Sequence, residues 1–278
     1  MLMEKLYLIV LMVVLGLCFG SFVNAAVWRI KHKKDLVRAR SQCVHCKHTL
    51  AWYDLIPVVS WVILRAKCRN CKKPISIQYP IVELAVAALF VVSYLFWPFA
   101  LNGLNKWVLF GLWLISGVIL AILFIYDLKW LVLSNKLTYP LIVIGLIAAS
   151  LRLVTAQDFS TVAFNIGFSV LVLAGVYLLI FIWSRGKWIG FGDVKLCLAL
   201  GLLLANWQLA LICLFLANLL GCAVVLPGMA MNKLTRTSHI PFGPFLIIGF
   251  IIAGLWGQQL IDWYISLTLI GVTTSQVI

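Results

Sequence analysis

The sequence predicts an all-α polytopic membrane protein with about eight transmembrane helices and a small cysteine-containing loop domain. Of its 278 residues, 64% are hydrophobic and only 11% are charged. The mean hydropathy is +1.10, and no soluble domain needs so much apolar surface. Several uncharged runs also reach the length of about 20 residues that a helix needs to cross a bilayer.

These uncharged runs define the expected helices in order. The first, residues 6–28, has no convincing small-residue cleavage site, so we expect it to remain as a span. Residues 29–80 form the one polar region, and further runs follow at 84–105, 107–126, 137–151, 159–184 and within 237–261. The run 196–232 has 37 residues, which is too long for one crossing at about 1.5 Å per residue. We expect it to form two helices that turn near Asn206.

The basic residues predict the orientation of these helices. If 29–80 faces the cytoplasm, alternation places 127–136, 185–195 and 233–239 on the same side. These four segments hold 12, 2, 3 and 2 Lys or Arg residues, whereas the opposite side holds only Lys5, Lys106 and Arg152. Cytoplasmic loops collect basic residues in this way. The bias accounts for the formal net charge of +14 without nucleic acid as a partner.

Two of the eight acidic residues are candidate catalytic groups. Asp193 follows Gly190 and Gly192, which permit close backbone approaches, and Lys195 is a cation that would keep one carboxyl group charged. Asp127 is expected at the C-terminal end of a helix, where a negative charge is disfavoured, so capping does not explain it. Pairing with a neighbouring lysine is the simpler alternative for Asp127.

The predicted topology brings both aspartates to the same membrane face. Two carboxyl groups held close together share one proton and titrate as a unit. One can then accept a proton from water while the other donates to the oxygen of a peptide carbonyl, which is aspartic-protease chemistry. Glu83 begins the second expected span, where capping of the helix N-terminus is the first interpretation. It is also a candidate for binding a cofactor.

The polar region carries a candidate metal site. Two Cys-X-X-Cys pairs, Cys43 with Cys46 and Cys68 with Cys71, are separated by 21 residues. Four thiolates at this spacing predict a tetrahedral structural zinc ion. His45 and His48 are possible substitute ligands, although four sulfurs suffice. Disulfides or a redox pair are alternatives, but a cytoplasmic loop disfavours stable disulfides, and no thioredoxin-like βαβ pattern surrounds the pairs.

Further short motifs extend over most of the chain: Gly20-Ser21-Phe22-Val23-Asn24 with Arg29, Trp52-Tyr53-Asp54, Tyr79-Pro80-Ile81-Val82-Glu83 and Ile240-Pro241-Phe242-Gly243-Pro244. Together with the two aspartates and the cysteine pairs, they resemble the type IV prepilin peptidases, a bacterial family of intramembrane aspartic proteases. The resemblance implies that Asp127 and Asp193 are catalytic and that 81–278 is the peptidase domain. Residues 1–28 are then a first transmembrane helix and 29–80 a zinc-binding loop domain.

The resemblance also implies a reaction. Members cleave the short leader from type IV prepilins and pilin-like pseudopilins at the cytoplasmic face of the inner membrane. Many then methylate the new N-terminal amine with S-adenosylmethionine, and this expectation rests on the resemblance alone because no nucleotide-binding fingerprint occurs. The chain departs from the family where Leu-Pro-Asp is frequent, reading Leu133-Ser134-Asn135, and at Ala66, where glycine is common.

Two other functions fit parts of the sequence. An ion-coupled transporter with a zinc-binding cytoplasmic loop would use Asp127 and Asp193 as ion or proton ligands. Transport sites usually lie near the midplane beside broken helices, whereas these aspartates are expected at one boundary. A scaffold that binds a cytoplasmic partner through the cysteine loop would need the cysteines but not the aspartates.

Overall fold

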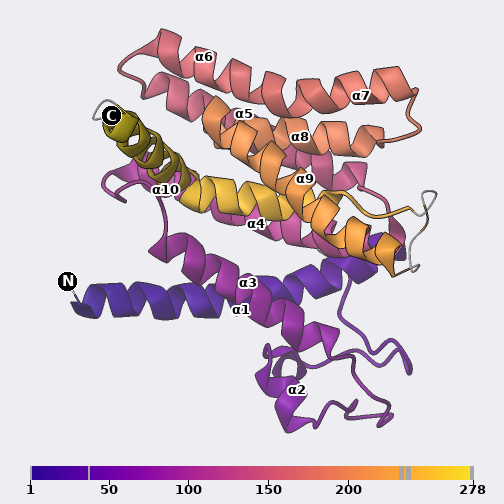
Figure 1. Ribbon diagram of the computed structural model, residues 1–278. Helices are drawn as coiled ribbons and strands as arrows, with labels where there is room; N and C mark the ends of the chain where they lie inside the picture. The colour runs from indigo at the N-terminus through magenta and orange to yellow at the C-terminus, as the bar shows by residue number, and fades with distance from the viewer. Residues whose placement is uncertain (1, 37, 232–234, 236–238, 276–278) are drawn as a thin grey trace. The chain divides into compact units, whose positions relative to one another are not determined.

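The computed structural model describes residues 2–36, 38–231, 235 and 239–275. These residues form helices joined by turns and loops, with two isolated β-bridges and no strand. The elements are α1 Leu2–Lys31, η1 Trp52–Leu55, α2 Val59–Ile63, α3 Gln78–Leu95, α4 Leu104–Trp130, α5 Asn135–Val154, α6 Phe159–Val170, η2 Leu171–Gly175, α7 Val176–Ser184, α8 Phe191–Leu204, α9 Trp207–Ala230 and α10 Gly243–Ser275 (Figure 1).

The all-α membrane fold is confirmed. Among the described residues, seven helices are long and apolar enough to cross a membrane, with α6, η2 and α7 counting as one continuous span. The run 196–232 divides where predicted, because Asn206 ends the first helix and caps α9 by accepting from the N–H groups of Gln208 and Leu209 at 2.9 and 3.4 Å. The first half, α8, has 14 residues and is about 21 Å long, short of the bilayer core of about 30 Å.

The second span differs from the prediction of 84–105 at both ends. It begins at Gln78, because Pro80 lies in the first turn, where its missing N–H costs nothing. It ends at Leu95, before Pro98, and α4 starts after Gly103, which has a φ of 86°. The last span begins at Gly243, inside the predicted range 237–261, but its helix continues past 261 to Ser275. The basic segment 233–239 lies largely outside the described residues.

The chain forms two compact units, Met1–Trp97 with Leu114–Ile125, and Pro98–Trp113 with Tyr126–Ile278. In the first unit, α1 and α3 lie side by side (Figure 1). A Cβ atom added to Gly16 would stand 2.5 Å from the Cα of Ala87, and one added to Gly20 would stand 2.6 Å from the Cα of Glu83. Because the two glycines are four residues apart, they form one flat stripe along α1 that brings the two backbones together.

In the second unit, α8 runs parallel to α5 and is held to it near both ends. At one end, Lys195 donates to the side chain of Asn135. At the other end, Nη1 of Arg152 donates to the carbonyl oxygen of Leu203 at 2.7 Å, which satisfies a free carbonyl of the last turn of α8. Gly201 lets α6 approach closely, since an added Cβ atom would lie 2.9 Å from the Cα of Val170. These contacts fix the start of α8.

Candidate active site and metal centre

Asp127 lies near the C-terminal end of α4. The helix ends at Leu131, which adopts a left-handed conformation with a φ of 55° and donates its N–H to the carbonyl oxygen of Asp127 at 2.8 Å. The Asp127 side chain is only 4% exposed, and its Oδ2 atom accepts from the N–H of Gly243 at 3.1 Å. The start of α10 therefore fixes the orientation of this carboxyl group.

Asp193 is the third residue of α8 and is partly buried. Gly190 is the N-cap residue, and a Cβ atom there would stand 3.4 Å from Oδ2 of Asp193. A Cβ atom at Gly192 would stand 3.1 Å from the Cβ atom of Leu133. The two glycines thus permit close approaches on either side of the carboxyl group, as the sequence predicts.

Leu133 connects the surroundings of the two aspartates. Leu133 lies against Gly192, as described above, and also against Gly243. A Cβ atom added to Gly243 would stand 3.2 Å from Cδ2 of Leu133 and 2.7 Å from Oδ2 of Asp127. Asp127 is also close enough to interact electrostatically with Asp193. Leu133 therefore lies between Gly192, which precedes Asp193, and Gly243, which binds Asp127. The sequence places Leu133 in the right loop, but no pattern singles out its side chain.

Lys195 does not balance the charge of the aspartates as predicted. Its ammonium group donates to Asn135 and lies 5.3 Å from the ring centroids of both Tyr139 and Phe191. Among the described residues, no ion pair joins it to Asp127 or Asp193. Its contacts instead hold the first turn of α8 against the start of α5, so it supports the position of Asp193 indirectly.

The sequence also missed a buried polar pair in this unit. Tyr177 is 2% exposed, and its hydroxyl oxygen accepts from Nδ2 of Asn218 at 2.9 Å. The π-helical turn η2 directly precedes Tyr177 in α7, and turns of this kind are frequent at functional sites. Tyr177 lies close enough to interact electrostatically with Asp193. Uncharged residues within an apolar run gave no signal for this pair.

Gly243→Ala should slow any reaction that uses the Asp127 carboxyl group, without unfolding the protein. The new Cβ atom would push Oδ2 of Asp127 away from its present position, and a displacement of about 1 Å in a reacting group can cost about 10²-fold in rate. The control is Gly167→Ala, since nothing lies within 4 Å of a Cβ atom at that helical position. The measurement is the rate of precursor cleavage by the two variants at equal protein levels. Equal rates would contradict the close contact at Asp127.

The four cysteines of the polar region come together in two hairpins of matching geometry. In the first, the N–H of Cys43 donates to His48 and its carbonyl oxygen accepts from Lys47, at 2.9 and 3.0 Å. The second hairpin has the same two bonds at the same distances, from Cys68 to Lys73 and from Lys72 to Cys68. Lys47 and Lys72 occupy the same place in each hairpin, with φ values of 57° and 61°.

The sulfur atoms are arranged as a metal site requires. All four Sγ atoms lie within 4.8 Å of one another, and those of Cys43 and Cys71 are 3.9 Å apart. Zinc–sulfur bonds of about 2.3 Å would set the edges of a tetrahedron at about 3.8 Å. The cysteines are free thiols in the described structure, and His45 and His48 are exposed. The cluster could therefore hold a zinc ion with four sulfur ligands.

The structure shows the backbone conformation at Ala66, one of the positions where the chain departs from the family pattern. Ala66, which stands where glycine is common, has a φ of 57° and follows Arg65, whose φ is 50°. Glycine adopts this left-handed conformation without the penalty that a Cβ atom brings. The turn that leads into the second hairpin is thus built with strained residues in this chain.

Glu83 does not cap its own helix. It is the sixth residue of α3, it is 5% exposed, and its Oε2 atom accepts from the N–H of Val58 at 2.7 Å. The first interpretation failed because the helix starts at Gln78 rather than at 84. The carboxyl group instead ties the cysteine loop to α3. As a cofactor-binding residue, Glu83 remains a prediction.

The chain matches two protein families in succession. Residues 14–97 match the bacterial peptidase A24 N-terminal domain, and residues 114–226 match the type IV leader peptidase family. A prepilin leader peptidase/N-methyltransferase of Aeromonas hydrophila is 31% identical over 275 residues, covering 90% of this chain and 91% of that relative. The chain belongs to the type IV leader peptidase family.

Other members of the family are similarly close. The prepilin leader peptidase/N-methyltransferase of Legionella pneumophila is 33% identical, covering 85% of this chain and 79% of that relative. A type 4 prepilin-like proteins leader peptide-processing enzyme of Escherichia coli is 32% identical, covering 87% of this chain and 91% of that relative. No solved structure matches the chain. The family resemblance seen in the sequence motifs is therefore confirmed, and the protein is a peptidase-family membrane protein.

Proposed function

We propose that this protein cleaves the leader peptide from type IV prepilins and pilin-like pseudopilin precursors, with Asp127 and Asp193 as the catalytic pair. The observation that carries the proposal is the position of Leu133, which lies against Gly192, the residue before Asp193, and against Gly243, whose N–H binds Asp127. Membership of the type IV leader peptidase family supports it. The same membership does not favour an ion-coupled transporter.

In the proposed reaction, the two carboxyl groups hold one proton between them. The ionised member takes a proton from a water molecule, whose oxygen attacks the scissile carbonyl carbon, while the protonated member donates to the carbonyl oxygen. Collapse of the tetrahedral intermediate breaks the C–N bond, and the leaving amine takes up a proton. The leader then ends in a new carboxyl group and the mature pilin begins with a new amine.

The pair would act at the cytoplasmic face of the inner membrane. A pilin-like precursor has a basic leader followed by an apolar helix, so its cleavage junction would lie at the membrane boundary. Asp127 and Asp193 lie in segments 127–136 and 185–195, which hold two and three Lys or Arg residues and which the positive-inside rule assigns to the cytoplasm. These positions support the same depth for the junction and the aspartates.

Two cofactors belong to this proposal. Zinc at Cys43, Cys46, Cys68 and Cys71 would be structural, because four cysteine ligands leave no open position for chemistry. S-adenosylmethionine would supply a methyl group to the new N-terminal amine, as the names of the relatives suggest. Within this chain we assign no residue to that second reaction beyond the candidate Glu83.

The test is to mix the purified protein in lipid nanodiscs with a candidate precursor and to weigh the products, with and without S-adenosylmethionine. We expect the precursor to lose its leader in both samples, and the mature product to be one methyl group heavier only when S-adenosylmethionine is present. Cleavage without the added methyl group would restrict the protein to the peptidase reaction. An intact precursor, offered with several different pilin-like sequences, would contradict the proposal.

A further inference from the structure

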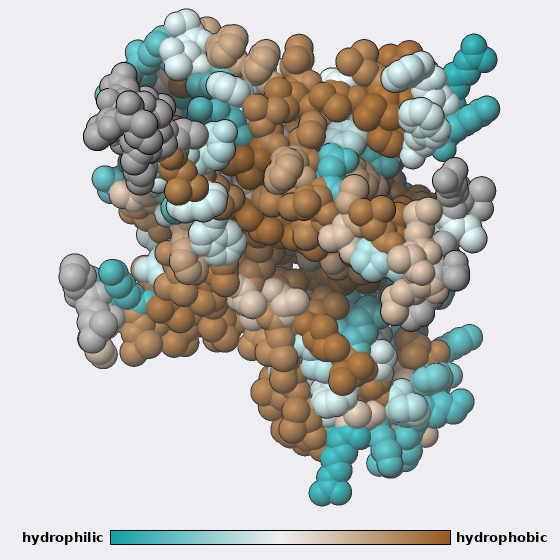
Figure 2. Space-filling view, in the orientation of Figure 1, coloured by the Kyte–Doolittle hydropathy of each residue, from teal (hydrophilic) through white to brown (hydrophobic). Residues whose placement is uncertain are grey.

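The short helix α2 presents an apolar surface that the described residues leave exposed. Its five residues are Val-Ser-Trp-Val-Ile, and none of them is buried. Val59, Val62 and Ile63, spaced as neighbours on one helix face, are 50%, 61% and 70% exposed, and Trp52 of the adjoining η1 is 77% exposed. We call these four residues the α2 face. Figure 2 shows the surface over α2 in brown, bordered by teal side chains. A contiguous exposed patch of this kind marks an interaction site.

The backbone is strained to display this face. Val58 has a φ of 60° and a ψ of −51°, and the N–H of Val59 bonds to the carbonyl oxygen of Pro57 in a γ-turn. A β-branched residue in this region is an outlier that the surrounding structure must hold in place. The carboxyl group of Glu83 does so by accepting from the N–H of Val58. The turn therefore sets α2 in a fixed position on α3.

That position is at the membrane boundary. Glu83, the sixth residue of α3, lies about 7.5 Å along the helix axis from Gln78, and its carboxyl group binds Val58, the residue just before α2. Ile77, Ile81 and Leu84 of this part of the chain are 62%, 56% and 54% exposed, as expected of side chains that contact lipid. The α2 face thus lies level with the first lipid-facing turns of α3, where headgroups meet acyl chains and where tryptophan is favoured.

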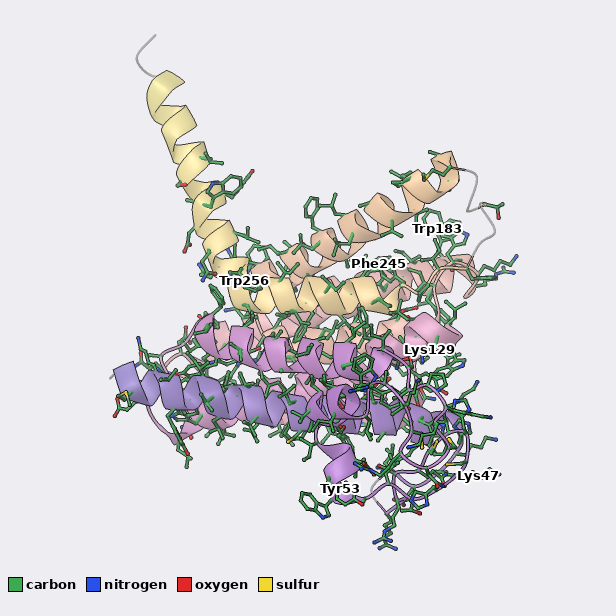
Figure 3. The ribbon with its side chains drawn as sticks, turned by 90° about the horizontal axis from the view of Figure 1, so that it is seen from below. Lys47, Tyr53, Lys129, Trp183, Phe245 and Trp256 are labelled. Carbon is green, nitrogen blue, oxygen red and sulfur yellow. The ribbon has the colours of Figure 1, made fainter. Side chains whose placement is uncertain are left out.

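The charges around the α2 face complement an anionic surface. Five exposed basic residues follow the helix within ten positions: Arg65, Lys67, Arg69, Lys72 and Lys73. Asp54, which precedes α2 in η1, is paired with Arg69 at 2.9 Å. The guanidinium group of Arg69 also lies over the ring of Tyr53. Figure 3 shows Tyr53 and Lys47 at the outer edge of the loop region, well apart from each other. Basic residues next to an apolar face are typical of segments that bind anionic lipid.

We propose that α2 is an interfacial anchor, whose apolar face enters the boundary of a bilayer containing anionic phospholipid while the neighbouring basic residues contact the headgroups. The anchor holds the cysteine hairpins at a fixed height above the membrane. This role does not depend on the peptidase proposal, since it concerns the loop and the lipid alone. It also explains why the buried carboxyl group of Glu83 binds the strained backbone of Val58.

The test uses photo-crosslinking in the full-length protein. The photoreactive amino acid p-benzoylphenylalanine replaces Ile63, or Lys47 as the control at an exposed site of the first hairpin. Both variants are placed in nanodiscs of phosphatidylethanolamine and phosphatidylglycerol, irradiated and analysed by mass spectrometry. We expect a phospholipid adduct at 63 and none above background at 47. The adduct at 63 should be mostly lost when phosphatidylcholine replaces phosphatidylglycerol.

Three results would overturn the proposal. An adduct between 63 and a peptide, whether from another segment of this chain, a second copy or a precursor, would make the α2 face a protein-binding surface. Equal amounts of lipid adduct at 63 and 47 would show that α2 is not a specific anchor. An adduct at 63 whose yield does not depend on phosphatidylglycerol would show that the headgroup charge plays no role. Unchanged bound metal in both variants shows that the hairpins remain folded, so that a negative result is not a folding defect.

Discussion

Asp127→Asn and Asp193→Asn should each slow leader cleavage by about 10³-fold or more. Asparagine keeps the size of the side chain but can neither take a proton from water nor donate an acidic proton to the carbonyl oxygen. The double variant should be no slower than either single variant, because residues that act as one unit are not additive. The measurement is the rate of conversion of precursor to mature pilin, followed by mass, at equal amounts of membrane-inserted enzyme.

Asp262→Asn is the matched control for this experiment. Asp262 lies on α10, is exposed and accepts from the side chain of Gln258 at 3.0 Å, so its loss should leave cleavage nearly unchanged. Wild-type cleavage by either Asp127→Asn or Asp193→Asn would remove that residue from the catalytic pair. If both variants kept full function while cysteine variants lost it, the scaffold interpretation would replace the peptidase.

Cys68→Ser should release the bound metal and unfold the loop between α1 and α3. Binding of structural zinc contributes about 10–16 kcal/mol of folding free energy in zinc-finger peptides, more than the few hydrogen bonds that otherwise hold the loop, such as the one from Val58 to Glu83, can supply. Metal analysis should give about one zinc ion per wild-type chain and little in the variant. Limited proteolysis should then cut the variant within residues 32–77 and spare the wild-type loop.

Cys222→Ser provides the control for the metal experiment. Cys222 is a free, exposed thiol on α9, and its replacement should change neither the zinc content nor the pattern of proteolysis. Chelation of the wild-type protein should reproduce the proteolysis of Cys68→Ser, because the two treatments remove the same ion. Retention of zinc by Cys68→Ser would show that the cysteine cluster is not the metal site.

Much of this architecture could be predicted from the sequence because membrane spans and motifs are local signals. The absence of charge located the helices, and Asn206 marked a turn because a side chain that accepts backbone N–H groups ends an apolar run. The predicted start of α3 at residue 84 is wrong. Pro80 does not end the polar region, because a proline fits the first turn of a helix.

The site itself was predictable only in part. The glycines before Asp193 single out that carboxyl group in the sequence, and the family resemblance adds Asp127 as its partner. The place of Leu133 between Gly192 and Gly243 depends on three segments far apart in the chain, and no local pattern encodes such packing. The hydrogen bond of Lys195 was not predictable for the same reason, because its partner Asn135 lies 60 residues away in the sequence.

The matching cysteine hairpins have an evolutionary consequence. Each carries Cys, Cys and Lys in the same order, the second set lying 25 positions after the first: Cys43, Cys46 and Lys47, then Cys68, Cys71 and Lys72. Their shared backbone bonds and left-handed lysines are what a tandem duplication of one short ancestral unit would leave behind. If the two hairpins are equivalent, we expect a chimera carrying two copies of either one to keep the four cysteines close enough to bind a metal ion.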